Sequence, residues 1–435
     1  MMFEKYDAYK DSGMDWIGEI PHDWNVVKLK HLLQEPLKYG ANESGIEFSE
    51  DLPRYIRITD FNDDGKLDEK NKLSLTWKKG KDYLLDDGDI LLARSGASVG
   101  KSFLFKLENA NEKAFCFAGY LIKAKADINK IIPKYLYLYL NSEVFFEWKN
   151  LIFNKATIEN IGADKYSEFF IILPSLDEQS KILDLLNPFL MNIDQAIAIK
   201  EQQIALFNER KQIVIQKAVT QGLDPNVPMK DSGVEWIGQI PEHWEIIKVK
   251  NLFKLIIEPA PKNNDLELLS VYTDIGVKPR KELEERGNKA STTDGYWKVK
   301  KGDIIVNKLL AWMGAIGLSN YDGVTSPAYD ILRATKPLNP YIYHLLFRSP
   351  TCSAELKKHS RGIMDMRLRL YFDKFGDVLV PYAPIAEQNE IIKYIEVEEQ
   401  KINAGIELIN QQIEKLKEYK TTLINDAVTG KIKVA

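Results

Sequence analysis

Hydrophobic residues in two segments, 177–225 and 386–435, recur at alternating spacings of four and three residues. The positions are Ile193, Ile197, Ile204, Phe207 and Val214 in the first segment, and Ile402, Ile406, Ile409, Ile413, Leu416 and Leu423 in the second. This spacing predicts two long helices with coiled-coil seams. A seam of roughly 26 residues is about 40 Å long.

Two equal stripes in one chain favour antiparallel packing of the two helices against each other. The alternative is that each stripe packs on its own neighbouring domain. Pro188 lies inside the first pattern and predicts a helix that is kinked or begins in two pieces.

The segments outside the helices alternate short apolar runs with Gly, Asp and Asn. The runs are "YIRITDF" (55–61), "GDILLA" (88–93), "EFFIILP" (168–174), "GDIIVNKL" (302–309) and "GDVLVP" (376–381). These runs predict strands, and helical patches precede the last strand of each segment. The sequence thus predicts two α/β (α+β) domains, joined by two long antiparallel coiled-coil helices in a pseudo-twofold arrangement.

The segments that open and close each half of the chain occur twice, and we call these segments the repeated frame. Residues 10–24 read "KDSGMDWIGEIPHDW" and residues 230–244 read "KDSGVEWIGQIPEHW"; extended through Lys30 and Lys250, 12 of 21 positions are identical. The Glu-Gln junctions and the long helices repeat at an offset of 209 residues. The interiors match only in outline, which is expected if both halves dock identical partners while each half recognises something different. The repeated Trp and Pro residues predict an anchored segment.

The repeats divide the chain into five parts. They are an N-terminal arm (1–25), a first recognition domain (26–176), a central helix (177–225), a second recognition domain with its opening segment (226–385) and a C-terminal helix (386–435).

Composition narrows the class of protein. The net charge is −4, from 59 basic and 63 acidic residues, so any nucleic-acid binding must come from local clusters. We find no run of 18 apolar residues and no signal peptide, and the two cysteines have no metal spacing. We therefore expect a reduced, cytoplasmic protein with no bound metal.

Catalytic motifs are incomplete. "RSGASVGKSF" (94–103) resembles a phosphate-binding loop, but Ser95 stands where that loop needs Gly. Asn339-Pro340-Tyr341 lacks one Pro of a methyltransferase motif, and Glu418-Tyr419-Lys420 lacks the partner strand of a nuclease. We therefore predict no catalytic residue and no enzyme activity in this chain.

Several loops carry the side chains that contact phosphates and base edges. The candidate DNA-binding residues are Lys78, Lys79, Lys81, Arg94, Ser95, Ser98, Lys101, Lys155 and Thr157 in the first half, and Asn307, Lys308, Trp312, Ser360, Arg361, Arg367 and Arg369 in the second. The alternative for each loop is an ordinary solvated basic surface.

The "SGxxWIGxIPxxW" openings (12–24 and 232–244), the "LPxLxEQ" and "PIAEQ" junctions and the helix ends "KAVTQGLD" and "DAVTGKI" resemble the specificity subunits of type I restriction–modification systems. The likeness covers essentially the whole chain, in order.

This resemblance implies a non-catalytic subunit of a methyltransferase/endonuclease complex. Its two target-recognition domains would each read one half of a bipartite asymmetric DNA site, and its helices would set the gap and dock two modification (methyltransferase) subunits. Restriction (translocase/nuclease) subunits would join, and S-adenosylmethionine, ATP and Mg²⁺ would bind the partners. A 40 Å spacer corresponds to roughly one turn of DNA, about 34–36 Å. The alternative is a duplicated protein-binding scaffold without DNA recognition.

Overall fold

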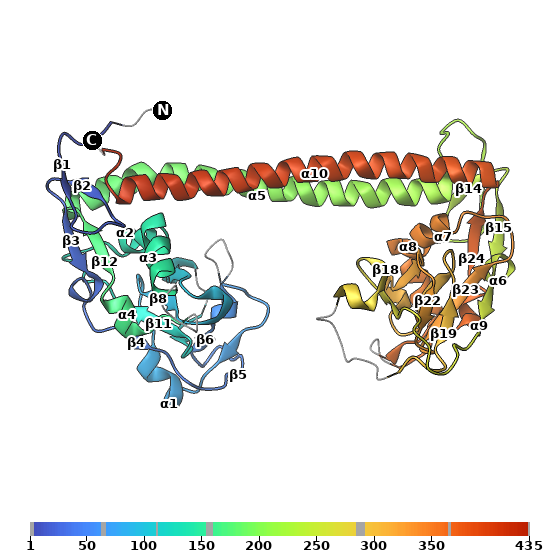
Figure 1. The fold of residues 1–435 in the computed structure, drawn as a ribbon, viewed down its shortest axis with the longest axis horizontal. Helices are drawn as coiled ribbons and strands as arrows, with labels where there is room; N and C mark the ends of the chain where they lie inside the picture. Colours follow the sequence, from blue (N-terminus) through green and yellow to red (C-terminus); the bar gives the residue numbers. More distant parts are fainter. Residues whose placement is uncertain are drawn as a thin grey trace. The chain divides into compact units, whose positions relative to one another are not determined.

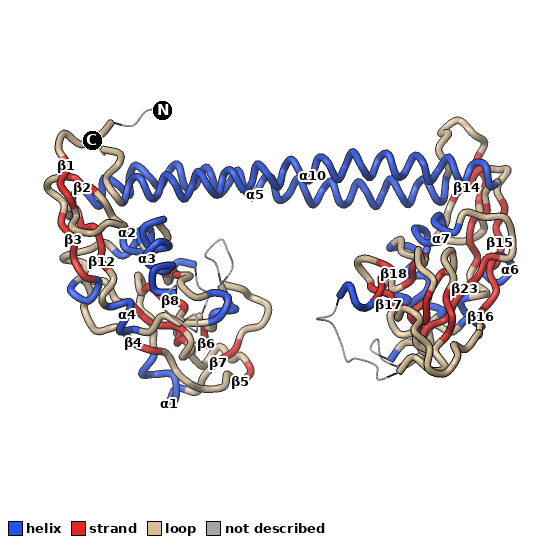
Figure 2. The backbone as a smooth tube through the Cα atoms, in the orientation of Figure 1, coloured by secondary structure: helices blue, strands red, loops and turns tan. Residues whose placement is uncertain are grey.

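The computed structural model describes residues 4–61, 67–109, 112–153, 160–283, 292–363 and 367–433. The chain divides into two compact units: unit 1 comprises Met1–Glu201 and Asn410–Ala435, and unit 2 comprises Gln202–Ile409. Both units mix helices with short strands (Figure 1, Figure 2), which confirms the predicted mixed α/β class.

Two long helices, α5 (Leu176–Gln221) and α10 (Ile385–Val428), contribute to both units. The strands of unit 1 are β1 (Tyr9–Asp11), β2 (Glu19–Pro21), β3 (Asn25–Lys28), β4 (Lys38–Tyr39), β5 (Ile46–Glu47), β6 (Arg54–Ile56), β7 (Leu73–Ser74), β8 (Ile90–Ala93), β9 (Ser102–Leu104), β10 (Phe115–Phe117), β11 (Leu121–Ala124) and β12 (Phe170–Leu173). Its short helices are α1 (Trp77–Gly80), α2 (Pro133–Tyr139), α3 (Glu143–Phe153) and α4 (Ala163–Ser167).

The strands of unit 2 are β13 (Met229–Asp231), β14 (Gln239–Pro241), β15 (Glu245–Lys248), β16 (Phe253–Ile256), β17 (Leu269–Tyr272), β18 (Gly276–Pro279), β19 (Trp297–Val299), β20 (Ile304–Asn307), β21 (Ile316–Leu318), β22 (Gly323–Thr325), β23 (Tyr329–Ala334) and β24 (Leu379–Tyr382). Its short helices are α6 (Val249–Leu252), α7 (Pro340–Phe347), α8 (Pro350–His359) and α9 (Phe372–Phe375).

An antiparallel sheet of the same strand order lies in each unit. The order is β4-β11-β8-β9 in unit 1 and β16-β23-β20-β21 in unit 2. Every residue of the inner strands β8 and β20 is buried, as expected for continuous apolar runs. Elsewhere the units differ: β6 pairs with β10 in parallel, whereas β17 and β18 form an antiparallel pair. The sheet is therefore repeated although its sequence is not.

The repeated Gly-Asp-Ile builds the turn before each inner strand. Gly88 and Gly302 have φ angles of 87° and 95°, which favour glycine. The buried carboxylates of Asp89 and Asp303 each accept the backbone N–H three residues earlier, at 2.8 Å. Burial raises the pKa of Asp89. This repeat fixes the start of the strand and has a structural role.

The repeated opening phrase, residues 10–24 and 230–244, forms the same hairpin in both units, since β1 pairs with β2 and β13 pairs with β14. In each hairpin an Asp side chain, Asp11 or Asp231, accepts the N–H of the Gly two residues later at 2.9 Å. Trp24 and Trp244 are each 1% exposed and belong to the core of their unit. The phrase is an anchor, as predicted.

Helices α5 and α10 are antiparallel where they touch within each unit (Figure 1). In unit 1 the Lys420 ammonium contacts the Asp194 carboxylate at 2.6 Å, and in unit 2 Lys211 donates to Asn403 at 3.3 Å. Both residues of one pair are displaced by 209 from those of the other, so the contact between the helices is itself repeated.

The predicted seam residues lie on the less exposed side of both helices. Ile193, Ile402, Ile409, Ile413 and Leu423 are buried, and Ile197, Ile204, Phe207, Val214, Ile406 and Leu416 are half-buried. Near the helix ends, residues such as Ile215 and Ile424 pack into the core of a unit. The two packing alternatives thus apply to different stretches of the same helices.

Of the two alternatives predicted for Pro188, a helix that begins in two pieces is wrong, because helix α5 is one element with Pro188 inside it; Leu186 and Leu190, on either side of the proline, pack in the core. One strand expectation is also wrong. The strand expected over 55–61 ends at Ile56, because Asp60 accepts the Arg57 N–H at 2.8 Å and closes a short 3₁₀ turn.

The repeated Glu-Gln junction joins each long helix to its unit. The side chain of Gln179 accepts the Ile132 N–H, and that of Gln388 accepts the Asn339 N–H, both at 2.8 Å. Ile132 and Asn339 are the residues directly before helices α2 and α7. Both glutamines are buried, so the bonds fix the helix against the domain.

Helix α5 is long and apolar enough to cross a membrane by length and composition alone, with a mean hydropathy of 1.2 in its most apolar window. Its Ile182, Leu186 and Ile193 are buried in the core of unit 1. Only 28% of this window is buried inside the structure, and a single helix of this composition is weak evidence for a membrane span.

Candidate nucleic-acid interface

The loops that follow the inner strands β8 and β20 have similar backbone structures in the two units but carry different side chains. Each loop contains a 3₁₀ turn, Gly96–Ser98 or Ala311–Met313, and a glycine with positive φ. The Ile161 N–H donates to the Arg94 carbonyl at 2.8 Å, and the Leu370 N–H donates to the Lys308 carbonyl at 2.9 Å. Both loops are therefore fastened to the segment that precedes α4 or α9. We call them the unit 1 edge (residues 94–98 with 160–161) and the unit 2 edge (residues 307–313 with 369–370).

The unit 1 edge has an arginine held on an aromatic ring. The guanidinium carbon of Arg94 lies 5.0 Å from the centroid of the Tyr39 ring. The Tyr39 hydroxyl accepts the Ala163 N–H at 2.9 Å, which fixes the ring. Tyr39 was not among the sequence candidates, and we find no local sequence signal that would have identified it.

Two buried polar atoms at this edge have no hydrogen-bond partner in the part of the chain that the structure describes: Nε of Arg94 and Oδ1 of Asn160. Ser95 forms a backbone bridge with Asn160, which brings the side chains of Arg94 and Asn160 to the same edge. Because buried polar groups are nearly always hydrogen-bonded, these atoms indicate a place where a ligand completes the bonding. Asn160 was not a sequence candidate.

The other candidates in the first half are placed as follows. Ser95 and Ser98 are half-buried in the loop, and Lys101 is exposed at its end. Lys155 and Thr157 lie outside the described residues. Lys78, Lys79 and Lys81 are exposed on α1 and the turn after it, a separate segment, where Lys79 pairs with Glu43 at 2.6 Å.

In unit 2 the residues that begin the edge are occupied by local bonds. Asn307 is 7% exposed, and its side-chain oxygen accepts the Leu309 N–H at 3.1 Å. Lys308 donates to the Pro327 carbonyl at 3.0 Å and pairs with Asp330 at 3.3 Å. These two residues build the loop, and their part in base reading stays a prediction.

The remaining sequence candidates of unit 2 follow the edge or belong to it. Arg361 and Arg369 exchange two backbone hydrogen bonds of 2.9 Å, and the Arg361 side chain contacts Asp373 at 2.8 Å. Arg367 is exposed, and Ser360 donates to the Leu356 carbonyl at 2.9 Å. Nε1 of the half-buried Trp312 has no hydrogen-bond partner among the described residues, and the Lys357 ammonium lies 4.8 Å above the ring.

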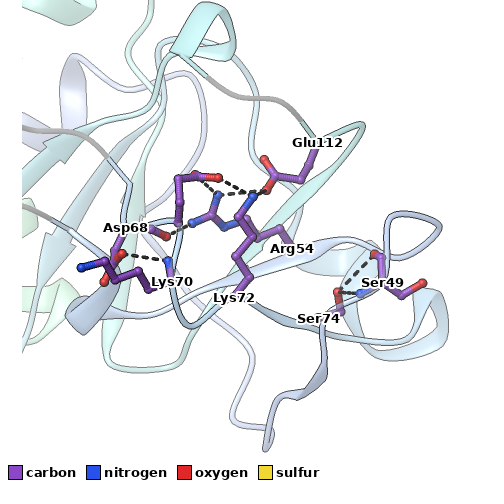
Figure 3. Close-up of polar contacts among 8 residues, drawn as sticks. Ser49, Arg54, Asp68, Lys70, Lys72, Ser74 and Glu112 are labelled. Carbon is purple, nitrogen blue, oxygen red and sulfur yellow. Dashed lines mark hydrogen bonds and ion pairs between the residues drawn. The ribbon is translucent and has the colours of Figure 1, made fainter. Parts of the chain in front are cut away.

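A buried charge cluster supports the second sheet of unit 1 (Figure 3). Arg54 is 1% exposed and contacts Glu69 at 2.9 Å and Glu112 at 3.0 Å, while Lys72 contacts Glu112 at 2.8 Å. An open hollow of about 580 Å³ lies beside it. The hollow is lined by Arg57, Thr59, Asp60, Asp68, Lys70, Asn71, Lys72 and Leu73. Because Asp60 neutralises Arg57 at 2.7 Å, the hollow suits a polyanion less well than the unit 1 edge does.

A second repeated feature is a set of exposed ion pairs in each unit. Lys28 and Lys30 both contact Glu168 at 2.5 Å, and Lys248 and Lys250 contact Asp377 at 3.1 and 2.8 Å. The hydrogen bonds from these lysines lower the pKa of each carboxyl to about 2. The carboxylates are therefore ionised at neutral pH, and this surface belongs to the repeated frame.

The described residues offer no catalytic set. Among them, we find no group of three or more His, Cys, Asp and Glu that would hold a metal ion. Burial raises the pKa of the Cys116 thiol to about 12 and also raises that of Cys352, so neither is a reactive thiolate. The loop at 94–103 leads into strand β9 and not into a helix, unlike a phosphate-binding loop.

Comparison with known proteins agrees with this geometry. Residues 21–206 match the family model described as the type I restriction modification DNA specificity domain. Two proteins of Methanocaldococcus jannaschii bear the names of the MjaX and MjaVIII type I restriction enzyme specificity subunits. They are 26% and 23% identical to the chain and align with all of it, over 99% and 98% of their own lengths.

A solved chain from a study of complex assembly and conformational transition of the type I restriction–modification system has the same fold. It superposes with a TM-score of 0.62 at 14% identity, over 95% of this chain and 99% of its own. Members of the family bind DNA and assemble with methyltransferase and restriction subunits. Over its whole length the chain is therefore similar to the specificity subunits of type I restriction–modification systems, and its residues 21–206 match their DNA specificity domain.

Proposed function

We propose that this chain is the non-catalytic DNA-specificity subunit of a type I restriction–modification system, and that each of its units reads one half of a bipartite, asymmetric site in double-stranded DNA. The observation that carries the proposal is the correspondence of the two edges. They follow equivalent strands of an equivalent sheet, β8 and β20, and are fastened in the same way. Their side chains differ: Arg94 has no acidic partner among the described residues and lies on the Tyr39 ring, whereas Lys308 is paired with Asp330. A repeated scaffold with unlike contact residues suits two different half-sites.

The sequence candidates enter the same proposal. We assign base or phosphate contacts at the edges or next to them to Arg94, Ser95, Ser98, Lys101, Trp312, Ser360, Arg361, Arg367 and Arg369, and peripheral phosphate contacts to Lys78 and Lys81. Exposed cations bind phosphates without sequence preference, whereas ordered side chains at a groove discriminate between bases.

The repeated frame supports the partner assignments. We propose that the antiparallel helices α5 and α10 set the gap between the half-sites. Two modification subunits would dock on the duplicated frame, and restriction subunits would join them. S-adenosylmethionine, ATP and Mg²⁺ would bind these partners in the cytoplasm. The functional boundaries remain those of the sequence repeats: 1–25, 26–176, 177–225, 226–385 and 386–435.

Exchange of residues 246–380 for the matching segment of another specificity subunit tests the division of labour. We expect one half-site to change while the other half and the gap stay the same, because the edge of unit 1 and both helices are untouched. The readout is base-resolved DNA methylation in cells that carry the exchanged chain with its methyltransferase partners.

Two outcomes would overturn the proposal. A change in both halves would mean that the units read DNA jointly. A native complex without any sequence preference would favour the duplicated protein-binding scaffold.

A further inference from the structure

We propose that Arg94 is a specificity-determining residue that recognises a guanine in the half-site read by unit 1, and that Tyr39 is its positioning residue. This inference rests on the proposed function, because it assumes that unit 1 reads DNA. It adds the residue, the base and the way in which the side chain is held.

The guanidinium of Arg94 lies on the Tyr39 ring but has no carboxylate or carbonyl partner among the described residues. Its Nε is buried without a hydrogen-bond acceptor, and neither a carboxylate nor a carbonyl of the described residues accepts from its side chain. Most half-buried cations of the units are paired instead, such as Lys72 with Glu112 and Lys308 with Asp330. A half-buried unpaired charge is costly in the free protein, so its retention points to an external acceptor.

The accessible part of this guanidinium is its outer end. Nε is covered, whereas the two terminal nitrogens form no hydrogen bond with the described residues and are not among the buried unpaired atoms. Two parallel N–H groups in one plane match O6 and N7 of guanine, which the major groove presents side by side. The same fork also fits a phosphate, so the distinction depends on how the side chain is held and must be tested.

Arg94 is held at both its backbone and its side chain. Its N–H donates to the Tyr120 carbonyl at 3.1 Å and its carbonyl accepts from Ile161 at 2.8 Å. The Tyr39 ring supports the guanidinium at 5.0 Å and is itself fixed through Ala163. A cation fixed in this way loses little freedom on binding and can discriminate between bases, whereas phosphate contacts need no such preparation.

The test compares Arg94→Gln, Arg94→Lys and the native chain, each in complex with its methyltransferase partners. The DNA probes carry each base in turn at every position of the half-site assigned to unit 1. We expect the native complex to prefer guanine at one position by about 10- to 100-fold. Both variants should lose this preference at that position alone, since Lys keeps the charge but not the planar fork.

Tyr39→Leu should reduce the same preference in part, and Tyr39→Phe, which keeps the ring, should reduce it less. Lys113→Gln is the matched control, because Lys113 is an exposed cation of unit 1 outside the edge. It should leave the preference at every position unchanged.

The inference is overturned if Arg94→Lys keeps the native preference, or if Arg94→Gln weakens binding equally for all probes with a shallower salt dependence. Either result identifies a phosphate contact. If the native complex itself binds all probes alike, the proposed function has failed instead, so the two failures are distinguishable. Circular dichroism of each complex verifies that the variants are folded.

Discussion

Replacement of Arg54 by Ala is expected to lower the free energy of unfolding of unit 1 by about 3–5 kcal/mol. Arg54 is 1% exposed on β6 and bonds to Glu69, to Glu112 and to the Asp68 carbonyl (Figure 3). Its removal leaves the carboxylate of Glu112, whose side chain is 5% exposed, with Lys72 as its remaining partner. An under-paired buried charge is the largest single electrostatic cost that a substitution can create.

Chemical denaturation of the purified subunit measures this effect, and hydrogen exchange in β6 and β10 assigns it to unit 1. Lys79→Ala is the control, because the Lys79–Glu43 pair is exposed and should contribute about 0–1 kcal/mol. The double replacement Arg54→Met, Glu112→Leu should recover much of the loss, since it removes both charges. A loss below about 1 kcal/mol for Arg54→Ala would show that the cluster does not hold the sheet.

Trp244→Ala is expected to destabilise unit 2 by about 3–5 kcal/mol, because a fully buried indole leaves a large cavity. Its Nε1 also donates to Glu387 at 3.0 Å, on the first turn of α10. His243 contacts the same carboxylate at 2.8 Å. The repeated phrase is thus bonded to the long helix in unit 2.

The matching residue in unit 1 offers an internal control. Trp24 is equally buried, but its Nε1 has no partner among the described residues. Trp244→Phe and Trp24→Phe remove the same volume, so the difference between them isolates the bond to Glu387. We expect Trp244→Phe to cost more by about 1.5–3 kcal/mol in the same denaturation experiment. Equal losses would mean that the bond contributes no net stability.

The frame of this protein was readable from the sequence because it is written twice. The heptad rows locate both long helices, and their residues lie on the buried side. The Trp-rich phrases predict anchors, and Trp24 and Trp244 are anchors. Repetition made these features visible without knowledge of any contact.

The edges were only partly predictable, because pairing over long sequence distances decides which cations are free. Lys79 and Lys308 are residues of the type that contacts DNA, yet their ammonium groups form ion pairs with Glu43 and Asp330. Tyr39 and Asn160 join Arg94 only through tertiary contacts from distant parts of the chain. Tyr39 lies outside every candidate stretch, and Asn160 lies close to the candidates Lys155 and Thr157, but composition alone did not distinguish it from its neighbours.

Selection of binding sites from random double-stranded DNA by the native complex with its methyltransferase partners tests the central claim most directly. Two unlike readers on one repeated frame predict a bipartite, asymmetric site with two different halves and a fixed gap. A single uninterrupted site, two identical halves or no enrichment of any sequence would contradict it.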